Sequence, residues 1–284
     1  MNNEIELLEE KMNLNLRKVF VIGILLFCII VINLAVFFTI THKSDGVDQE
    51  QNEQINIDTI TLSENFNDIF DNTISYQDNT LNVNKKDNSK EIIYTSYSNN
   101  ENKDSMYELN VSIPYLNMNS SSAEKINQEI NNLFYNKAIN ILSNANNTNT
   151  IYSVKYKAYI NDNILSLVIS ATLKEGANAQ RLMIKTYNYN ISSNEQLDID
   201  KALGYRQLSS QYVQNKITDT IKLASENVSV YNELGYSKYI RNINDDIYKV
   251  ENTSTFFIGE NKALYIIYPY GNSNYTTEFD LLVI

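Results

Sequence analysis

The residues most able to support catalysis in this sequence are four carboxylates available for acid–base or nucleophilic roles: Asp162, Glu175, Glu251 and Glu278. Glycoside hydrolysis requires only two such groups, one acting as the acid and the other as the base or nucleophile. The sequence singles out no pair among the four, and turn residues are usually solvated. We therefore expect a protein that is not an enzyme. The alternative is a cell-wall hydrolase or modifying enzyme that uses paired carboxylates.

Other catalytic chemistry is limited by the presence of one His and one Cys in 284 residues. A Ser-His-Asp or Cys-His arrangement needs a His close to the nucleophile, and zinc sites are mostly built from several His and Cys side chains. The seven glycines are scattered along the chain and form no glycine-rich motif, so the sequence contains no phosphate loop or dinucleotide fingerprint. We expect no cofactor and no metal.

Calcium binding would require clustered oxygen ligands, and two segments come nearest to that pattern. These are Asp198-Ile-Asp200 and the run from Asn242 to Asp246. Neither matches the EF-hand loop, with its Gly and its distal Glu. We interpret the first as an acidic pair at a helix N-terminus, where the helix dipole favours negative charge. The second is interpreted as a solvated loop.

The overall charge is acidic, with 23 Lys and Arg against 34 Asp and Glu and a formal net charge of −11. This balance argues against nucleic-acid binding, which needs a clustered cationic surface. Tyrosine is abundant, with 21 residues, and a tyrosine offers a large contact area with a polar tip. We select Tyr268 and Tyr270 as candidate ligand-binding residues. The alternative is that strand tyrosines fill positions at the edge of the core.

Residues 19–40 form an apolar run of 22 residues without a charge. As a helix this run is about 33 Å long, enough to cross a bilayer core of about 30 Å. A cleaved signal peptide would have a shorter apolar region followed by small residues. Lys11, Arg17 and Lys18 precede the run and only Lys43 follows closely, which predicts a cytoplasmic N-terminus. We expect a single-pass protein of the cell membrane.

This anchor divides the chain into four expected parts. Residues 1–18 are a cytoplasmic segment and residues 19–40 a transmembrane helix. Residues 41–90 are mostly polar and are expected to form a linker or stalk, because such sequence buries too little surface to offset chain entropy. The apolar residues between Ile57 and Ile74 indicate a short helix on or near the domain. Residues 91–284 are expected to form an extracytoplasmic domain, which contains no Cys and therefore no disulfide.

Within residues 91–284 the hydrophobic pattern alternates between strand and helix periods, so we expect an α+β fold with a mainly antiparallel sheet and two principal helices packed on it. A helix is expected to follow the hydroxyl residues at Ser120–Ser122 and to reach Ile141. A second is expected from Ile199 to about Ala224, with a short one over 236–243. The expected strands are 92–98, 106–116, 151–160, 164–173, 181–191, 254–259, 263–271 and 277–284.

The order of these elements resembles the extracytoplasmic part of the RsiV-like family of lysozyme-sensing anti-sigma factors, paired domains of unknown function also found in some peptidoglycan deacetylases. The residues that carry the resemblance are Ile113-Pro114-Tyr115, Lys125-Ile126-Asn127, 163–167, 187–191, 197–203, Phe256-Phe257-Ile258, 265–271 and Glu278-Phe279. Where the family often has a Gly-Gly-Ala-His turn, this sequence has Glu175-Gly176-Ala177-Asn178 and lacks the His. The turn keeps the Gly-Ala pair of the family, and the resemblance implies ligand contacts at Gly176, Ala177 and Asn178.

The resemblance also implies a function and partners. We expect a membrane-anchored, non-catalytic sensor in a bacterial envelope, with a lysozyme-like protein or peptidoglycan as the external ligand and a sigma factor as the internal partner. The 18 residues before the membrane are short for holding a sigma factor. A structural envelope protein without a ligand is the remaining alternative.

Overall fold

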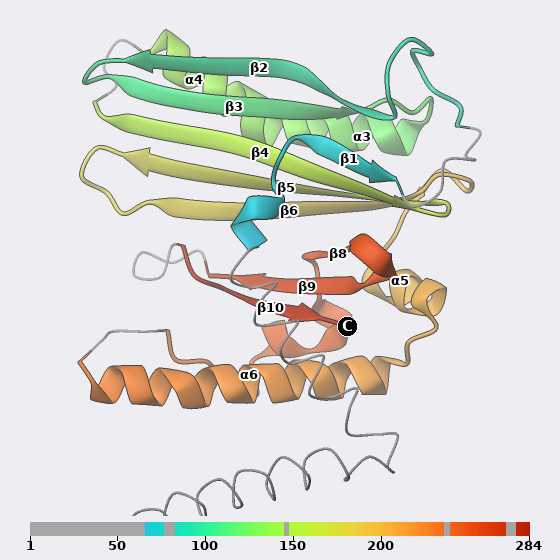
Figure 1. Cartoon of the computed structure of the whole chain (residues 1–284), viewed down its shortest axis with the longest axis vertical. Helices are drawn as coiled ribbons and strands as arrows, with labels where there is room; N and C mark the ends of the chain where they lie inside the picture. The colour runs from blue at the N-terminus through green and yellow to red at the C-terminus, as the bar shows by residue number, and fades with distance from the viewer. Residues whose placement is uncertain (1–65, 77–82, 145–147, 236–238, 271–276) are drawn as a thin grey trace, which may run out of the picture. The chain divides into compact units, whose positions relative to one another are not determined.

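A computed structural model describes residues 66–76, 83–144, 148–235, 239–270 and 277–284 (Figure 1). These residues form two β-sheets and their helices, so the α+β class expected from the sequence is confirmed. The segment expected in the cytoplasm, residues 1–18, and the expected transmembrane helix, residues 19–40, lie outside the described residues. Among the helices that the structure describes, none is long and apolar enough to cross a membrane.

The larger sheet has seven strands in the order β2-β3-β4-β5-β6-β7, with β1 beside β4. The β4-β5-β6 meander is antiparallel, as the turn residues at 161–163 and 175–178 predict, whereas β3 and β1 both pair with β4 in parallel. The strands are β1 (Thr73–Tyr76), β2 (Ile93–Lys103), β3 (Tyr107–Leu116), β4 (Thr150–Asn161), β5 (Ile164–Glu175), β6 (Arg181–Asn190) and β7 (Glu195–Gln196).

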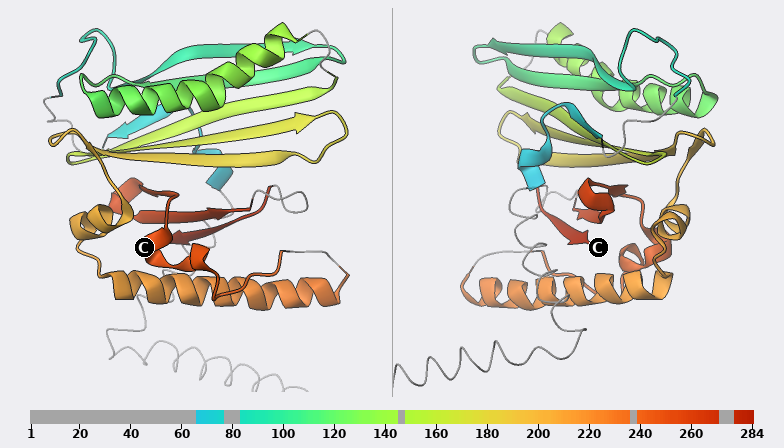
Figure 2. Two further views of the ribbon diagram at one scale, coloured as in Figure 1. Left: turned by 180° about the vertical axis from the view of Figure 1, so that it is seen from behind. Right: turned by 45° about the vertical axis from the view of Figure 1, so that its right-hand side comes forward.

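One face of this sheet is covered by a helical segment that crosses over between β3 and β4 (Figure 2). It consists of α3 (Ser121–Ile130), a π-helical turn η2 (Asn131–Tyr135) and α4 (Asn136–Ser143). Ser120 caps it, because its Oγ accepts a hydrogen bond of 3.1 Å from the Ala123 N–H. The buried face is Ala123, Ile126, Ile130, Phe134, Ala138 and Ile141, and the π turn accounts for the break in its helical spacing.

The second sheet is small and lies against the other face of β5 and β6. Its strands are β8 (Phe256–Ile258), β9 (Leu264–Pro269) and β10 (Phe279–Val283), in the order β10-β9-β8. Its far side packs on α5 (Ile199–Arg206) and α6 (Ser210–Glu233), so the two principal helices cover different sheets. Short 3₁₀ turns complete it: η3 (Asp246–Tyr248), η4 (Val250–Asn252) and η5 (Glu260–Lys262).

Two helix expectations need correction in this region. The helix expected over 199–224 is two helices, because Gln207 caps α5 in the left-handed region at φ 55° and Ser209 then starts α6. The short helix expected over 236–243 is absent from its described part, since residues 239–242 have no regular structure and 236–238 lie outside the described residues. The three expected C-terminal strands are confirmed.

Buried polar side chains connect the two sheets. Ser166 Oγ donates to Asn188 Oδ1 at 2.7 Å and accepts from the Ile258 N–H at 3.0 Å. Asn188 Nδ2 donates to the Phe256 carbonyl at 2.7 Å, and the Phe256 N–H donates to Thr186 Oγ1 at 3.1 Å. These contacts satisfy the main chain of β8 with side chains from β5 and β6, so they set where the small sheet lies on the large one.

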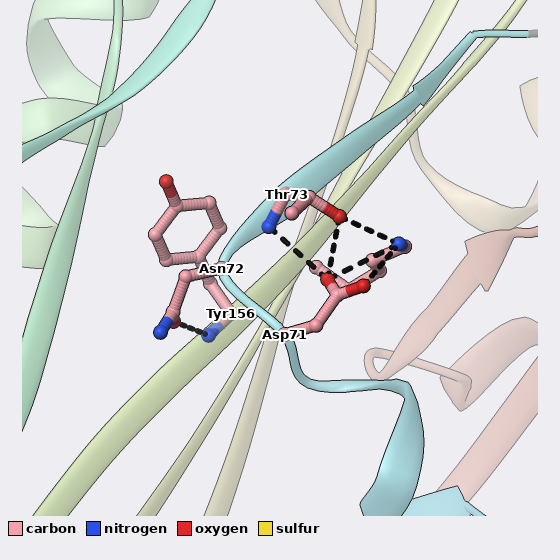
Figure 3. A network of polar contacts seen from close by, with 5 residues as sticks. Asp71, Asn72, Thr73 and Tyr156 are labelled. Carbon is pink, nitrogen blue, oxygen red and sulfur yellow. Dashed lines mark hydrogen bonds and ion pairs between the residues drawn. The ribbon is translucent and has the colours of Figure 1, made fainter.

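The folded domain begins earlier than residue 91. Phe66 and Phe70, in and after the 3₁₀ turn η1 (Phe66–Ile69), are buried between the two sheets. Asn72 exchanges hydrogen bonds with the main chain of Tyr156, and the Asp71 carboxylate accepts bonds from Thr73 and from Lys157 at 3.0 Å (Figure 3). Because these contacts hold β1 against β4, residues 66–76 are part of the domain rather than of a linker.

Two glycines provide a matched test of packing in the small sheet. At Gly259 an added Cβ would lie 2.4 Å from Tyr265 Cε2 and 3.1 Å from Phe257 Cε2, two rings stacked with their centroids 4.4 Å apart. We expect Gly259→Ala to lower the free energy of unfolding by about 1–3 kcal/mol, because overpacking forces these buried rings apart. The measurement is urea unfolding followed by circular dichroism.

Gly204 is the control for that substitution. It lies in α5, and an added Cβ meets nothing within 4 Å. We expect Gly204→Ala to raise the free energy of unfolding by about 0.5–1 kcal/mol, since Ala is the better helix former. If both substitutions change the free energy of unfolding equally, the stacked rings of Phe257 and Tyr265 do not restrict the space at Gly259.

Candidate functional site

The main candidate site is a groove of about 650 Å³ at the open side of β6, where the helical segment, the large sheet and β9 approach one another. Its helical wall is contributed by η2 and α4 and its opposite wall by Pro269. The lining residues are Asn132, Leu133, Phe134, Asn136, Lys137, Asn140, Tyr152, Ala171, Leu173, Arg181, Leu182, Met183, Ile184 and Pro269. We call this set the β6 groove.

The surface of the β6 groove is largely apolar and accessible. Met183 on β6 is 47% exposed and Leu133 on η2 is 37% exposed, although both are large apolar side chains. Below them Ala171 and Leu173 of β5 and the buried Tyr152 of β4 form the floor. Concave apolar surface with a few polar groups is typical of ligand sites.

Charged side chains lie at the end of the groove where β6 begins. Glu175 Oε1 accepts a hydrogen bond from Lys137 Nζ at 2.7 Å, and its Oε2 accepts one from Arg181 Nη2 at 2.6 Å. The bond from Lys137, with the charge of Arg181, holds the pKa of Glu175 below its ordinary value. Two cations thus share a single carboxylate at this end of the groove.

The predicted site residues Gly176, Ala177 and Asn178 form the tight turn that follows Glu175. Gly176 has φ +58°, and the Asn178 N–H donates to the Glu175 carbonyl at 3.1 Å. Ala177 and Asn178 are exposed. None of the three is among the lining residues of the β6 groove, so the turn acts there by holding Glu175 opposite Arg181.

The other two predicted site residues, Tyr268 and Tyr270, are buried in the core at 4% and 6% exposure. The expectation of a tyrosine contact surface is therefore not met at these positions, and the alternative of core-filling tyrosines describes them. Burial raises the pKa of Tyr268 to about 12. Only the residue between them, Pro269, reaches the β6 groove.

Tyr270 belongs to a buried charged network. Its hydroxyl donates to Asp280 and lies 2.9 Å from the hydroxyl of Tyr248. Asp280 accepts two hydrogen bonds of 2.6 Å from the guanidinium of Arg241, and both side chains are below 10% exposure. The network satisfies a tyrosine hydroxyl and an ion pair in one place, which gives it a structural role.

Two of the carboxylates considered for hydrolysis, Asp162 and Glu175, are held in ion pairs and lie far apart. Asp162 Oδ2 accepts hydrogen bonds from Lys262 at 2.6 Å and from Tyr205 at 3.2 Å. Glu175 is at the opposite end of β5, about 36 Å away at 3.3 Å per residue. Glycosidase carboxylates lie about 5–10 Å apart, so these two cannot form such a pair.

The oxygen clusters considered for calcium have structural partners. Asp198 caps α5 by accepting from the Lys201 N–H at 2.9 Å, as the interpretation of a helix N-terminus predicts. Asn242 Nδ2 donates to Asp245 Oδ1 at 2.8 Å within its turn. No group of three or more His, Cys, Asp or Glu side chains that could hold a metal occurs among the residues described by the structure.

The β6 groove could not be predicted from the sequence as one site. Its parts are separated by more than 130 residues, from Asn132 to Pro269, and only the packing of both sheets brings them together. One local feature of the sequence indicates the groove. Arg181, Met183 and Lys185 lie on the face of β6 toward the helices, and two of the three are charged, whereas a strand fully covered on that face would be apolar there.

Comparison with known proteins gives a likeness at the level of structure. No family model matches the chain, and no curated protein matches it. A DUF3298 family protein from Pseudomonas aeruginosa PAO1 has a TM-score of 0.42 at 12% identity, covering 64% of this chain and 82% of that one. A DUF3298 family member from Bacteroides fragilis NCTC 9343 has a TM-score of 0.34 at 10% identity, covering 63% and 80%. DUF denotes a domain of unknown function.

The buried network predicts a large effect of one neutral substitution. Asp280→Asn keeps the shape of the side chain but leaves the Arg241 guanidinium buried without a counter-charge. We expect the free energy of unfolding to fall by about 3–5 kcal/mol, measured by urea unfolding. The control is Asp246→Asn, which breaks the exposed pair with Lys249 and is expected to lower the free energy of unfolding far less, because solvent screens that pair. Equal losses would contradict a structural role of the network.

Proposed function

We propose that this chain is a membrane-anchored, non-catalytic binding protein of a bacterial cell envelope and that the β6 groove is its ligand site. The observation that carries the proposal is the groove itself: about 650 Å³ of concave, mostly apolar surface with two cations at one end. Its volume falls within the range of about 300–1,000 Å³ found for ligand sites. Glu175, the carboxylate at that end, is held in two ion pairs, which supports binding over hydrolysis.

The proposed ligand is a lysozyme-like protein or a peptidoglycan fragment, and the proposed consequence of binding is a signal to a sigma factor held on the inner side. The resemblance of the sequence to RsiV-like sensors motivates this assignment. Exposed Met183 and Leu133 supply apolar contact area, and flexible Met side chains suit recognition surfaces. Lys137 and Arg181 supply hydrogen-bond donors for a polar or anionic group.

The binding proposal is tested by isothermal titration calorimetry on the full-length chain in detergent micelles. Lysozyme and soluble peptidoglycan fragments are titrated separately, and binding of one of them is expected. Met183→Asp is expected to weaken that binding by about tenfold or more, because it places an unpaired carboxylate on surface that the ligand desolvates. Binding of neither titrant would remove the sensor proposal.

The matched control for the groove variant is Leu223→Asp. Leu223 is 49% exposed, close to the 47% of Met183, but it lies on α6 and does not line the β6 groove. The two variants carry the same added charge, so a loss of affinity in both would indicate a general charge effect. Retained affinity in Leu223→Asp alone assigns the ligand to the groove.

The membrane anchor proposed over residues 19–40 gives a separate prediction. A chain with epitope tags at both ends is expected to sediment with membranes after an alkaline wash, because 22 uncharged residues are retained in the bilayer. In spheroplasts, added protease is expected to remove the C-terminal tag and spare the N-terminal one. A mature chain found in the aqueous fraction and trimmed of its first forty residues would contradict the anchor.

A further inference from the structure

Strand β6 has an open edge along its first half. On one side it pairs with β5 from Arg181 to Asn190, whereas on the other side β7 pairs only with Tyr189 and Asn190. Near its centre, β8 approaches through the bond from the Phe256 N–H to Thr186 Oγ1. On the side away from β5, Arg181 to Ile184 line the β6 groove and pair with no strand among the described residues.

The direction of the unpaired main-chain groups follows from the ladder. The Leu197 N–H donates to the Asn188 carbonyl at 2.8 Å, so the main chain of Asn188 points away from β5. In an antiparallel strand this direction alternates, and β6 has no bulge in its pairing with β5. The N–H and C=O groups of Leu182 and Ile184 therefore also point away from β5, toward the groove.

No hydrogen bond between described residues uses these outward groups of Leu182 and Ile184. Two donors and two acceptors thus lie in a row along the groove, at the partly exposed Leu182 and at Ile184, which is 5% exposed, with a spacing of about 6.8 Å between equivalent groups. An extended polypeptide repeats its own donors and acceptors at the same spacing, whereas a glycan does not. The helical wall on one side and Pro269 on the other leave room beside this edge.

We propose that the β6 groove takes an extended, acidic peptide segment, which adds to the open edge of β6 as a further antiparallel or parallel strand. This inference rests on the proposed function and specifies the ligand of the same site as polypeptide. Strand addition to an exposed edge is a general mode of peptide recognition, in which main-chain bonds give affinity and alternate side chains give specificity. Here Met183 and Leu133 contact one set of side chains, and Pro269 and Leu182 contact the other.

Charge complementarity sets the acidic character of the segment. The chain carries a net charge of −11, yet at the start of β6 Lys137 and Arg181 share only Glu175. A carboxylate on the peptide residue beside Arg181 would complete this cluster with one more charge-assisted bond. Further along, Lys185 already pairs with Glu129 at 2.6 Å, so the preference for an acidic residue is confined to the start of the strand.

The probe is a pool of acetylated eight-residue peptides with one fixed Asp and randomised neighbours, offered to the full-length chain in detergent micelles. Peptides retained by the chain are identified by mass spectrometry, and the most enriched one is resynthesised. We expect its binding to slow hydrogen exchange of the Leu182 and Ile184 amides. An N-methyl group on alternate peptide nitrogens of the edge facing β6 is expected to weaken binding about tenfold or more, since it removes main-chain donors.

The same N-methyl groups on the opposite edge of the peptide are the control, and they are expected to leave affinity unchanged. On the protein, Arg181→Gln is expected to weaken binding of the Asp peptide and to have little effect on its Asn counterpart. The N-methyl comparison uses the unmodified protein, and Arg181→Gln changes an exposed side chain. Neither comparison therefore depends on a variant that disrupts β6.

Four results would overturn the inference. Equal binding of both N-methylated peptides would exclude main-chain pairing. Enrichment of no peptide from the pool, while peptidoglycan fragments still bind and are lost in Met183→Asp, would assign the groove to a glycan and leave the proposed function standing. Concentration-dependent dimers that protect the same two amides would assign the edge to a second copy of this chain. Binding of neither peptide nor peptidoglycan nor lysozyme would remove both proposals.

Discussion

The hydrogen-bonded contact between the two sheets is the constraint on which the rest of the structure depends. Ser166 and Asn188 are buried polar side chains on the adjacent strands β5 and β6 of the large sheet, and both are satisfied by the main chain of β8. Leaving such groups unpaired in the core would cost about 1–3 kcal/mol each, so the small sheet is held at one position on β5 and β6. That position brings Pro269 of β9 to the side of β6 and thereby makes the second wall of the groove.

The groove is the space that remains when two different layers cover the same sheet. On one face the π turn Asn131–Tyr135 shifts the helix so that Leu133 and Lys137 reach toward the edge, while Phe134 stays fully buried. On the other face the stacked rings of Phe257 and Tyr265 fix the small sheet. Neither layer extends across the edge of β6 among the described residues, so the first half of that strand is left between them.

Features decided by neighbouring residues could be predicted from the sequence. The Ser120 cap, the turns at 161–163 and 175–178, the alternation of Tyr152, Val154 and Tyr156 and the three closing strands all follow from local pattern. Features decided by distant contacts could not. Residues 66–76 fall within the segment expected as a linker, and their place in the domain depends on contacts with Lys157 and Tyr156 that the local pattern does not reveal. Tyr268 and Tyr270 fit either a surface or the edge of the core until Arg241 and Asp280 are placed beside them. The groove falls in the second group, because its walls come from residues far apart in the chain.

The open edge of β6 can be traced to a short stretch of sequence. After β6 the chain turns at Asn194 (φ 59°) and pairs for only two residues before Asp198 caps α5 and ends the strand. A longer β7 would have run antiparallel along Arg181–Asn188 and satisfied the outward groups of Leu182 and Ile184. Exposed edges are normally shortened or protected by charged side chains because they invite pairing with other chains. Arg181 and Lys185 give β6 this protection by charge, and Arg181, which shares its carboxylate partner with Lys137, makes an acidic strand the partner that the start of this edge accepts most readily.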